Sequence, residues 1–406
     1  MAVEASIPAI ATVDVVIILG FLVLVTLVGY GMSRAASRGI DAYFLGGNKI
    51  PWWVLGVSTS TSNFDMAGTM IIVAVVFSLG FKGFLVEIRG GVGLTLAFVM
   101  VFLAKWLRRT RVMTSSEWMK LRFGTDRQGQ AAHLLSAVAN VVLSIGMIVY
   151  FCKGAGSFLT HFLPFSELTC TTVMVAVGLS YTLMSGLYGV VFTDVVQMIL
   201  LSFTAIYISV VAYGMKEGVV LPDGFLSLDL SAPSTPGAAA LVAQDPATWE
   251  PIMNMFGICV LMWFVRSTLE GFGGMGGYSD QRFLASRNER EASLLTLEAI
   301  LLSVVQWTMI AGLVVMGYHL LQTGAAGSEI ILKDSEQVLP VVLSRMLPVG
   351  VKGLVVAGLI AAAMSTFVRC VFMPTPRQAS HGVTTTFPRP WQREHVRSTA
   401  MGNTPC

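Results

Sequence analysis

Charged side chains are scarce in this chain. Lys, Arg, Asp and Glu together make up 12% of the 406 residues, whereas hydrophobic residues make up 54%. The mean hydropathy of +0.73 is too high for a soluble domain of ordinary composition. The scarcity of charge therefore excludes an ordinary water-soluble protein and places the chain in a lipid bilayer.

Patterns that carry catalysis or metal binding are also missing. The five histidines are scattered, and the sequence has no HExxH, GxSxG or phosphate-binding loop. The five cysteines have neither the spacing of a zinc site nor the density of a disulfide scaffold. No basic, aromatic-rich face suggests nucleic acid, and no repeated segment suggests a channel filter. We therefore expect neither an enzyme nor a nucleic-acid-binding protein.

Apolar runs are what the sequence has in abundance. A helix that crosses a bilayer needs about 20 predominantly apolar residues. Nine runs qualify: 12–33, 51–80, 84–107, 130–153, 166–184, 188–214, 252–276, 293–321 and 351–368. The first run lacks the basic start and the cleavage site of a signal peptide, so we interpret it as a retained helix. The prediction is an all-α, polytopic membrane protein with about nine transmembrane helices.

Basic residues gather in alternate connections between these runs. They follow the first, third and seventh runs: Arg34, Arg38, Lys49; Lys105, Arg108, Arg109, Arg111, Lys120, Arg122, Arg127; Arg282, Arg287, Arg290. Lys and Arg accumulate in cytoplasmic loops. The alternation predicts a multi-pass protein of the cell inner (plasma) membrane with its N-terminus outside.

Polar residues interrupt the second run at STSTSNFDMAG (58–68). Hydroxyl side chains compete for backbone hydrogen bonds, and a broken helix at membrane depth is tolerated where it lines a cavity. The freed carbonyls then offer oxygen ligands to a cation. The Gly-rich stretch GFGGMGGYSD (271–280) allows two interpretations, a second unwound site or a cytoplasmic loop.

Two acidic residues lie inside apolar runs without a partner at helical spacing. Asp65 is in the second run and Asp194 is in the sixth. Ionisable groups at membrane depth are costly and mark the pathways of ions and protons. We predict that Asp65 and Asp194 handle cations.

Two further pairs of charges allow two interpretations. Glu87 and Arg89 begin the third run, and Arg266 and Glu270 lie four residues apart in the seventh. In one interpretation, Arg266 and Glu270 pair with each other along their helix, whereas Glu87 and Arg89 lie near the interface and extend to the headgroups. Alternatively, Glu87 and Glu270 lie on the path of a cation or a solute.

The ninth run, GLVVAGLIAAAMSTF (353–367), is rich in small residues, which allow membrane helices to approach closely. It ends in a pair of hydroxyls, Ser365 and Thr366. The residues alone favour hydrogen bonds from these hydroxyls to carbonyls one turn earlier. A cation site would require them to face the broken second run.

Four motifs in order resemble the sodium:solute symporter family. They are DAYFLGGNKIPWWVLGVS (41–58), YTLMSGLYGVVFTDVVQMILL (181–201), QRFLAS with RNERE (281–291) and GLVVAGLIAAAMST (353–366). The most specific feature is a Thr-Asp pair with Gln three residues after the Asp. The resemblance implies a LeuT-type fold with a leading helix (12–33), a first five-helix repeat (51–214) and an incomplete second repeat (252–368).

The resemblance also implies site residues. Sodium is expected at the carbonyls of Asn63, Met66 and Ala362 and the hydroxyls of Ser365 and Thr366. Asp194 resembles a second-cation or cation-exit carboxylate. Asp65 resembles a carboxylate of the proline-transporting branch, and Glu87 falls near an acidic position of the sugar-transporting branch.

The implied activity is sodium-coupled uptake of a small organic solute (a sugar, an amino acid or a carboxylate) by alternating access, with Na⁺ as the coupling ion. A solute sensor built on a symporter core and a non-transporting fragment are the alternatives.

The segment 369–406 differs from the rest of the chain. It is rich in Arg and Pro and has no apolar run that could cross a bilayer. A short cytoplasmic tail is one interpretation. We favour a frameshifted terminus, because helices of the family continue beyond the Ser-Thr pair.

Translation of the coding DNA after Val368 in the other two frames tests this hypothesis. We expect one shifted frame to encode further apolar helices. If neither frame does, the frameshift hypothesis is wrong.

Overall fold

A computed structural model describes residues 10–61, 64–86, 92–112, 114–227, 235–273 and 280–371. All of them belong to one compact unit of the chain. Within these ranges every regular element is a helix, which confirms the all-α prediction. The tail from residue 372 onward lies outside the described residues, so its interpretation stays a prediction.

The helices follow the apolar runs closely. Their bounds are α1 Thr12–Ala36, α2 Ile40–Leu45, α3 Trp52–Thr61, α4 Met66–Leu79, α5 Gly83–Val86, α6 Val92–Phe98, α7 Ala104–Thr110, α8 Ser115–Phe123, α9 Arg127–Leu159, α10 Glu167–Gly214, α11 Pro236–Gln244, α12 Pro246–Asn254, α13 Phe256–Gly273, α14 Asp280–Ala285, α15 Glu289–Gln322, α16 Ser328–Lys333, α17 Val338–Met346 and α18 Val351–Val371.

Four helices in the described part of the chain are long and apolar enough to cross a membrane: Thr12–Arg34, Arg127–Leu159, Thr182–Gly214 and Glu289–Gln322. Two bent pairs and the shorter apolar helices Glu167–Ser180 and Val351–Thr366 correspond to further predicted runs. The run 84–107 is covered by α5, α6 and α7, but residues 87–91 lie outside the described residues.

The predicted break in the second run is present. The helix pair Trp52–Thr61 and Met66–Lys82 is bent by 60°. Asp65 is the N-cap of α4, and its Oδ1 accepts a hydrogen bond of 2.6 Å from the backbone N–H of Gly68. A carboxylate at this position satisfies a free N–H and interacts favourably with the helix dipole. Asp65 therefore has a structural role, and its predicted part in cation handling stays a prediction.

A single glycine separates two of the predicted spans. We expected a connection between the runs 166–184 and 188–214, but α10 continues through both and breaks only at Gly186 (φ 54°, ψ −152°). A Cβ on Gly186 would lie 2.7 Å from the carbonyl oxygen of Tyr43. The positive φ and this close approach both require glycine, so the chain changes direction here without a loop.

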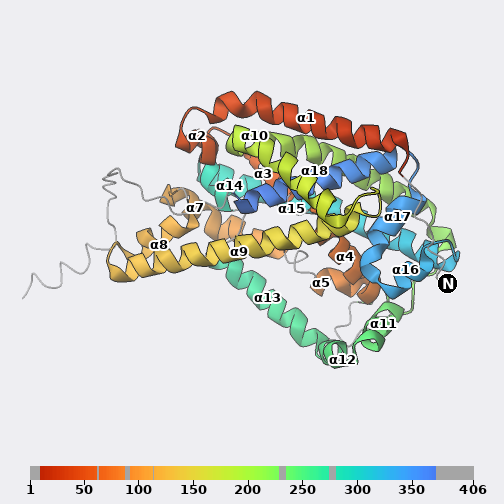
Figure 1. Cartoon of the computed structure of the whole chain (residues 1–406). Helices are drawn as coiled ribbons and strands as arrows, with labels where there is room; N and C mark the ends of the chain where they lie inside the picture. Colours follow the sequence, from red (N-terminus) through yellow and green to blue (C-terminus); the bar gives the residue numbers. More distant parts are fainter. Residues whose placement is uncertain are drawn as a thin grey trace, which may run out of the picture. The chain divides into compact units, whose positions relative to one another are not determined.

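Helix α10 has many neighbours. It packs against α1, α3, α15 and α18 (Figure 1).

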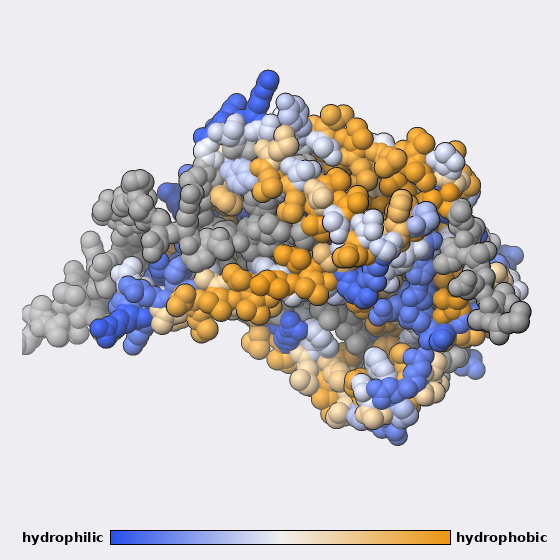
Figure 2. All heavy atoms as spheres, in the orientation of Figure 1, coloured by the Kyte–Doolittle hydropathy of each residue, from blue (hydrophilic) through white to orange (hydrophobic). Residues whose placement is uncertain are grey.

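Figure 2 shows hydrophobic side chains along the outer faces of α1 and α9. Val16 and Leu27 of α1 and Leu135 and Val142 of α9 are all more than half exposed. Exposed apolar faces on long helices are expected where lipid is the solvent.

The connections predicted to share one side of the membrane contact one another. The Asn48 side chain donates to the carbonyl of Leu284 at 2.8 Å, and Arg287 donates to the carbonyl of Lys49 at 2.7 Å. Arg109 and Glu289 form an ion pair at 2.7 Å. The basic connections after the first, third and seventh runs therefore meet at one end of the helices, as the alternation of basic loops requires.

Asp14 joins the leading helix to the last one. It lies on α1, is fully buried, and its Oδ1 accepts hydrogen bonds from the backbone N–H groups of Gly350 (2.6 Å) and Gly353 (2.9 Å) at the start of α18. A Cβ on Gly353 would lie 2.7 Å from the Cα of Asp14. A carboxylate at a helix N-terminus is favourable, so this contact fixes α18 against α1.

We predict that Asp14→Ala lowers the free energy of unfolding by about 2 kcal/mol, because two buried N–H groups lose a charged acceptor. Asp14→Asn retains an acceptor oxygen and is expected to lose less. Thermal unfolding of the purified protein in detergent measures both. Val16→Ala, at an exposed position of the same helix, is the control, and an equal effect of Val16→Ala and Asp14→Ala would contradict the prediction.

Candidate functional site

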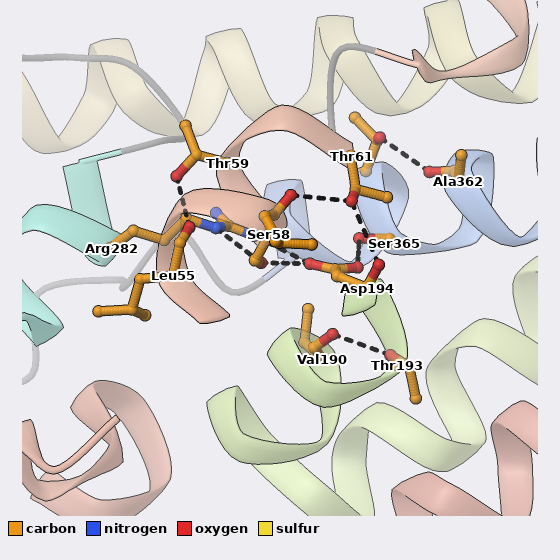
Figure 3. A network of polar contacts seen from close by, with 12 residues as sticks. Leu55, Ser58, Thr59, Thr61, Val190, Thr193, Asp194, Arg282, Ala362 and Ser365 are labelled. Atoms are coloured by element: carbon orange, nitrogen blue, oxygen red, sulfur yellow. Dashed lines mark hydrogen bonds and ion pairs between the residues drawn. The ribbon is translucent and has the colours of Figure 1, made fainter. Parts of the chain in front are cut away.

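Asp194 of α10 is at the centre of a buried polar cluster (Figure 3). Its side chain is fully buried. Ser58 of α3 donates a hydrogen bond to Oδ2, and Ser365 of α18 donates one of 2.5 Å to Oδ1. Thr61 of α3 also donates to the backbone carbonyl of Asp194 at 3.2 Å. One carboxylate thus connects three helices that are far apart in the sequence.

Arg282 of the short helix α14 supplies the opposite charge. Its Nη2 lies 3.4 Å from Oδ2 of Asp194, and its Nε donates to Oγ of Ser58 at 2.9 Å. The guanidinium is only 1% exposed. Burying a carboxylate is costly unless it is paired and hydrogen-bonded, and this cluster meets both conditions. The alternation of basic loops predicted Arg282 to be a loop charge, and its burial beside Asp194 corrects that interpretation.

The spacing of hydroxyls in α3 explains which of them reach α10. Thr59 and Thr61 donate to the carbonyls of Leu55 (2.8 Å) and Val57 (2.9 Å), one turn earlier in their own helix. Ser58 and Thr61 are three residues apart and share a face of the helix. That face is turned to Asp194, so the polar segment supplies both local hydrogen bonds and the contact between helices.

The two hydroxyls at the end of α18 behave differently. Thr366 donates to the carbonyl of Ala362 at 2.9 Å, which is the hydrogen bond within the helix that the residues alone favoured. Ser365 instead contacts Asp194. Ala362, Ser365 and Thr366 are all fully buried. The structure therefore brings one of the two predicted sodium hydroxyls of α18, that of Ser365, to the carboxylate of α10.

The other residues predicted for the site have no described contact with the cluster around Asp194. Met66 is the buried first residue of α4, which packs against α18. Asn63 and Glu87 lie outside the described residues, and so does the side chain of Glu270. Their predicted roles stay predictions.

The oxygen atoms of the cluster are suited to bind one class of ion. They are hydroxyls, backbone carbonyls and one carboxylate, which are the ligands that hard cations prefer. Within the described ranges no group of three His, Cys, Asp or Glu side chains is placed to hold a metal ion. The arrangement therefore fits an alkali cation better than a transition metal.

Sequence reasoning missed two members of the cluster, Ser58 and Arg282. Ser58 was one of several similar hydroxyls, and nothing in the sequence separates it from its neighbours. Arg282 does carry a signal, because it directly precedes the apolar residues of QRFLAS, one of the motifs that the resemblance rests on.

We predict that Arg282→Met lowers the free energy of unfolding by about 3–5 kcal/mol, because it leaves the buried carboxylate of Asp194 without a counter-charge. The double variant R282M/D194N is expected to lose less than the sum of the two single changes. Denaturant unfolding of all three variants measures the coupling. Arg109→Met removes an exposed ion pair and serves as the control, with no measurable change expected. Additive effects would contradict the prediction.

Comparisons with known proteins agree with the helical fold. A solved structure of a Na⁺-coupled sialic acid symporter, in a substrate-bound outward-open state, matches with a TM-score of 0.70 at 20% identity, covering 89% of this chain and 71% of that one. This likeness concerns the fold alone.

Curated relatives match over most of this chain. Sodium/glucose cotransporter 4 of Danio rerio is 25% identical over 380 residues, which is 87% of this chain and 55% of the relative. A sodium/sialic acid symporter of Aliivibrio fischeri is 22% identical over 359 residues, covering 87% of this chain and 66% of the relative. The chain thus spans between about half and two thirds of the length of these relatives. The model of the sodium:solute symporter family matches residues 43–390, and the chain therefore belongs to that family.

Proposed function

We propose that this chain couples the inward movement of sodium to the uptake of a small organic solute. The observation that carries the proposal is the contact between Ser365 and Asp194, because it joins a predicted sodium ligand to a buried carboxylate beside the broken helix. The family of the chain and the names of its relatives support the same function.

The hydroxyls of α18 are suited to a cation. A hydroxyl that donates its hydrogen keeps its oxygen lone pairs for another ligand. Ser365 donates to Asp194 and Thr366 donates to Ala362, so both oxygens can face an ion. We assign sodium to these hydroxyls and to the carbonyls of Ala362 and Met66, with Asn63 as a further ligand.

Such a site couples the ion to a conformation. Its ligands come from α4 and α18, which belong to different predicted repeats, so sodium binds well only when the two helices are apposed. Binding then shifts the population toward that state, and a solute that prefers the same state is coupled to the ion. At a membrane potential of about 100 mV, each sodium ion that moves inward adds about 2.3 kcal/mol to the free energy that drives uptake.

A polyhydroxylated solute is the substrate class that we favour. Relatives are named for glucose, sialic acid, mannose and myo-inositol. Asp65, the residue that resembled the proline-transporting branch, is occupied as the N-cap of α4. We therefore propose a sugar or a sialic acid rather than proline.

The proposed location is the cell inner (plasma) membrane with the N-terminus outside. The meeting of the three basic connections at one end of the helices supports this orientation, because positive loops gather on the cytoplasmic side.

Sodium-dependent uptake into proteoliposomes tests the function. We expect labelled glucose or sialic acid to accumulate with an inward sodium gradient and not with a choline gradient. Binding without accumulation would favour the alternative of a sensor or a non-transporting chain. Accumulation that is independent of sodium would contradict the proposal.

We predict that Thr366→Val raises the sodium concentration for half-maximal thermal stabilisation by about tenfold, which corresponds to about 1.4 kcal/mol. Thr296→Val is a matched control, because Thr296 is also buried in a long helix and donates at 2.9 Å to a carbonyl four residues earlier. The control is expected to leave the sodium midpoint unchanged. Equal midpoints for the two variants would exclude Thr366 as a ligand.

A further inference from the structure

Gln197 is a buried amide that the cluster around Asp194 does not use. It lies on α10, is fully buried, and neither its Oε1 nor its Nε2 has a hydrogen-bond partner among the described residues. Buried amides are almost always hydrogen-bonded, because an unpaired one costs free energy. The position of Gln197 therefore calls for a ligand rather than a packing role, which an apolar side chain would fill better.

Two contacts between α10 and α18 bracket this side chain. On one side of it, Asp194 accepts a hydrogen bond from Ser365. On the other side, a Cβ on Gly358 would lie 3.1 Å from Cδ2 of Leu201, so the helices approach closely there as well. Each pair of contact residues is seven positions apart in its own helix, which is two turns. The helices run in opposite directions, and Gln197 lies midway along the contact.

The face of α10 that carries Gln197 is the face turned to α18. Asp194, Gln197 and Leu201 are spaced by three and four residues and so lie on one side of the helix. Midway between Gly358 and Ser365, α18 has only alanines, including the fully buried Ala362. Small side chains leave room between the two helices at the level of Gln197.

We propose that the side-chain carbonyl of Gln197 is a further ligand of the transported sodium, between the Asp194 carboxylate and the sodium ligands of α18. An amide oxygen is a neutral, hard donor of the kind that such cations take. It adds a ligand without a charge, so the Asp194 and Arg282 pair stays balanced. The assignment rests on the sodium coupling proposed above.

Sodium titrations of variants test the assignment. The full chain in lipid nanodiscs is titrated with NaCl against choline chloride at constant ionic strength, and the unfolding temperature is recorded. Gln197→Met is expected to raise the sodium midpoint about tenfold. Without sodium it is expected to be as stable as the unaltered protein or more stable, because an unpaired buried amide has been removed. A structural role for the amide would instead lower stability in both conditions.

Thr204→Val is the matched control. Thr204 lies on the same helix, is 1% exposed, and its Oγ1 also lacks a hydrogen-bond partner among the described residues. It is two turns away from Gln197, and we expect its replacement to leave the sodium midpoint unchanged. An equal shift in Thr204→Val and Gln197→Met would overturn the proposal.

A second pair of variants covers a failure of Gln197→Met to fold. Gln197→Glu keeps an oxygen in place and is expected to keep or lower the midpoint, whereas Gln197→Asn withdraws the amide by one carbon and is expected to raise it. An unchanged midpoint in Gln197→Met, or in Gln197→Asn if the first variant does not fold, overturns this assignment alone. Absence of sodium stabilisation in the unaltered protein would overturn both the assignment and the proposed function.

Discussion

A carboxylate buried among membrane helices must be neutralised, and the arrangement around Asp194 satisfies that requirement. Arg282 supplies the charge, and Ser58 and Ser365 supply hydrogen bonds. Because the partners come from α14, α3 and α18, these elements must lie close together for the carboxylate to be tolerated. The contact between a broken helix and the helix with the predicted sodium hydroxyls follows from this electrostatic constraint.

The same constraint divides the hydroxyls into two kinds. Thr59 and Thr366 donate to carbonyls four residues earlier, so their hydrogen bonds survive any movement of the whole helix. Ser58 and Ser365 donate across helix boundaries, so their hydrogen bonds depend on how the helices are apposed. An ion that binds at Ser365 would therefore bind at a contact that changes when α18 moves relative to α10.

Helix α18 is held by a carboxylate near each end of its buried part. Asp14 of the leading helix accepts from N–H groups at its start, and Asp194 accepts from Ser365 two thirds of the way along. The leading helix precedes the two predicted repeats, yet it shares in fixing the helix that supplies three of the proposed sodium ligands. If sodium binds as proposed, ion binding and the stability of the fold are linked through the same helix.

The sequence by itself determined that the chain lies in a bilayer, which segments form its helices, and that the second apolar run is broken. Apolar runs of sufficient length can only be membrane helices, and polar residues at 58–68 cannot continue one undisturbed. Alternating basic loops also predicted which connections lie together. Only the tertiary structure decided which polar residues form the site. Ser58 is indistinguishable from neighbouring hydroxyls in the sequence, and Arg282 resembled a loop charge, because the partner of each, Asp194, is far away in the chain and is brought near only when α3, α10, α14 and α18 pack.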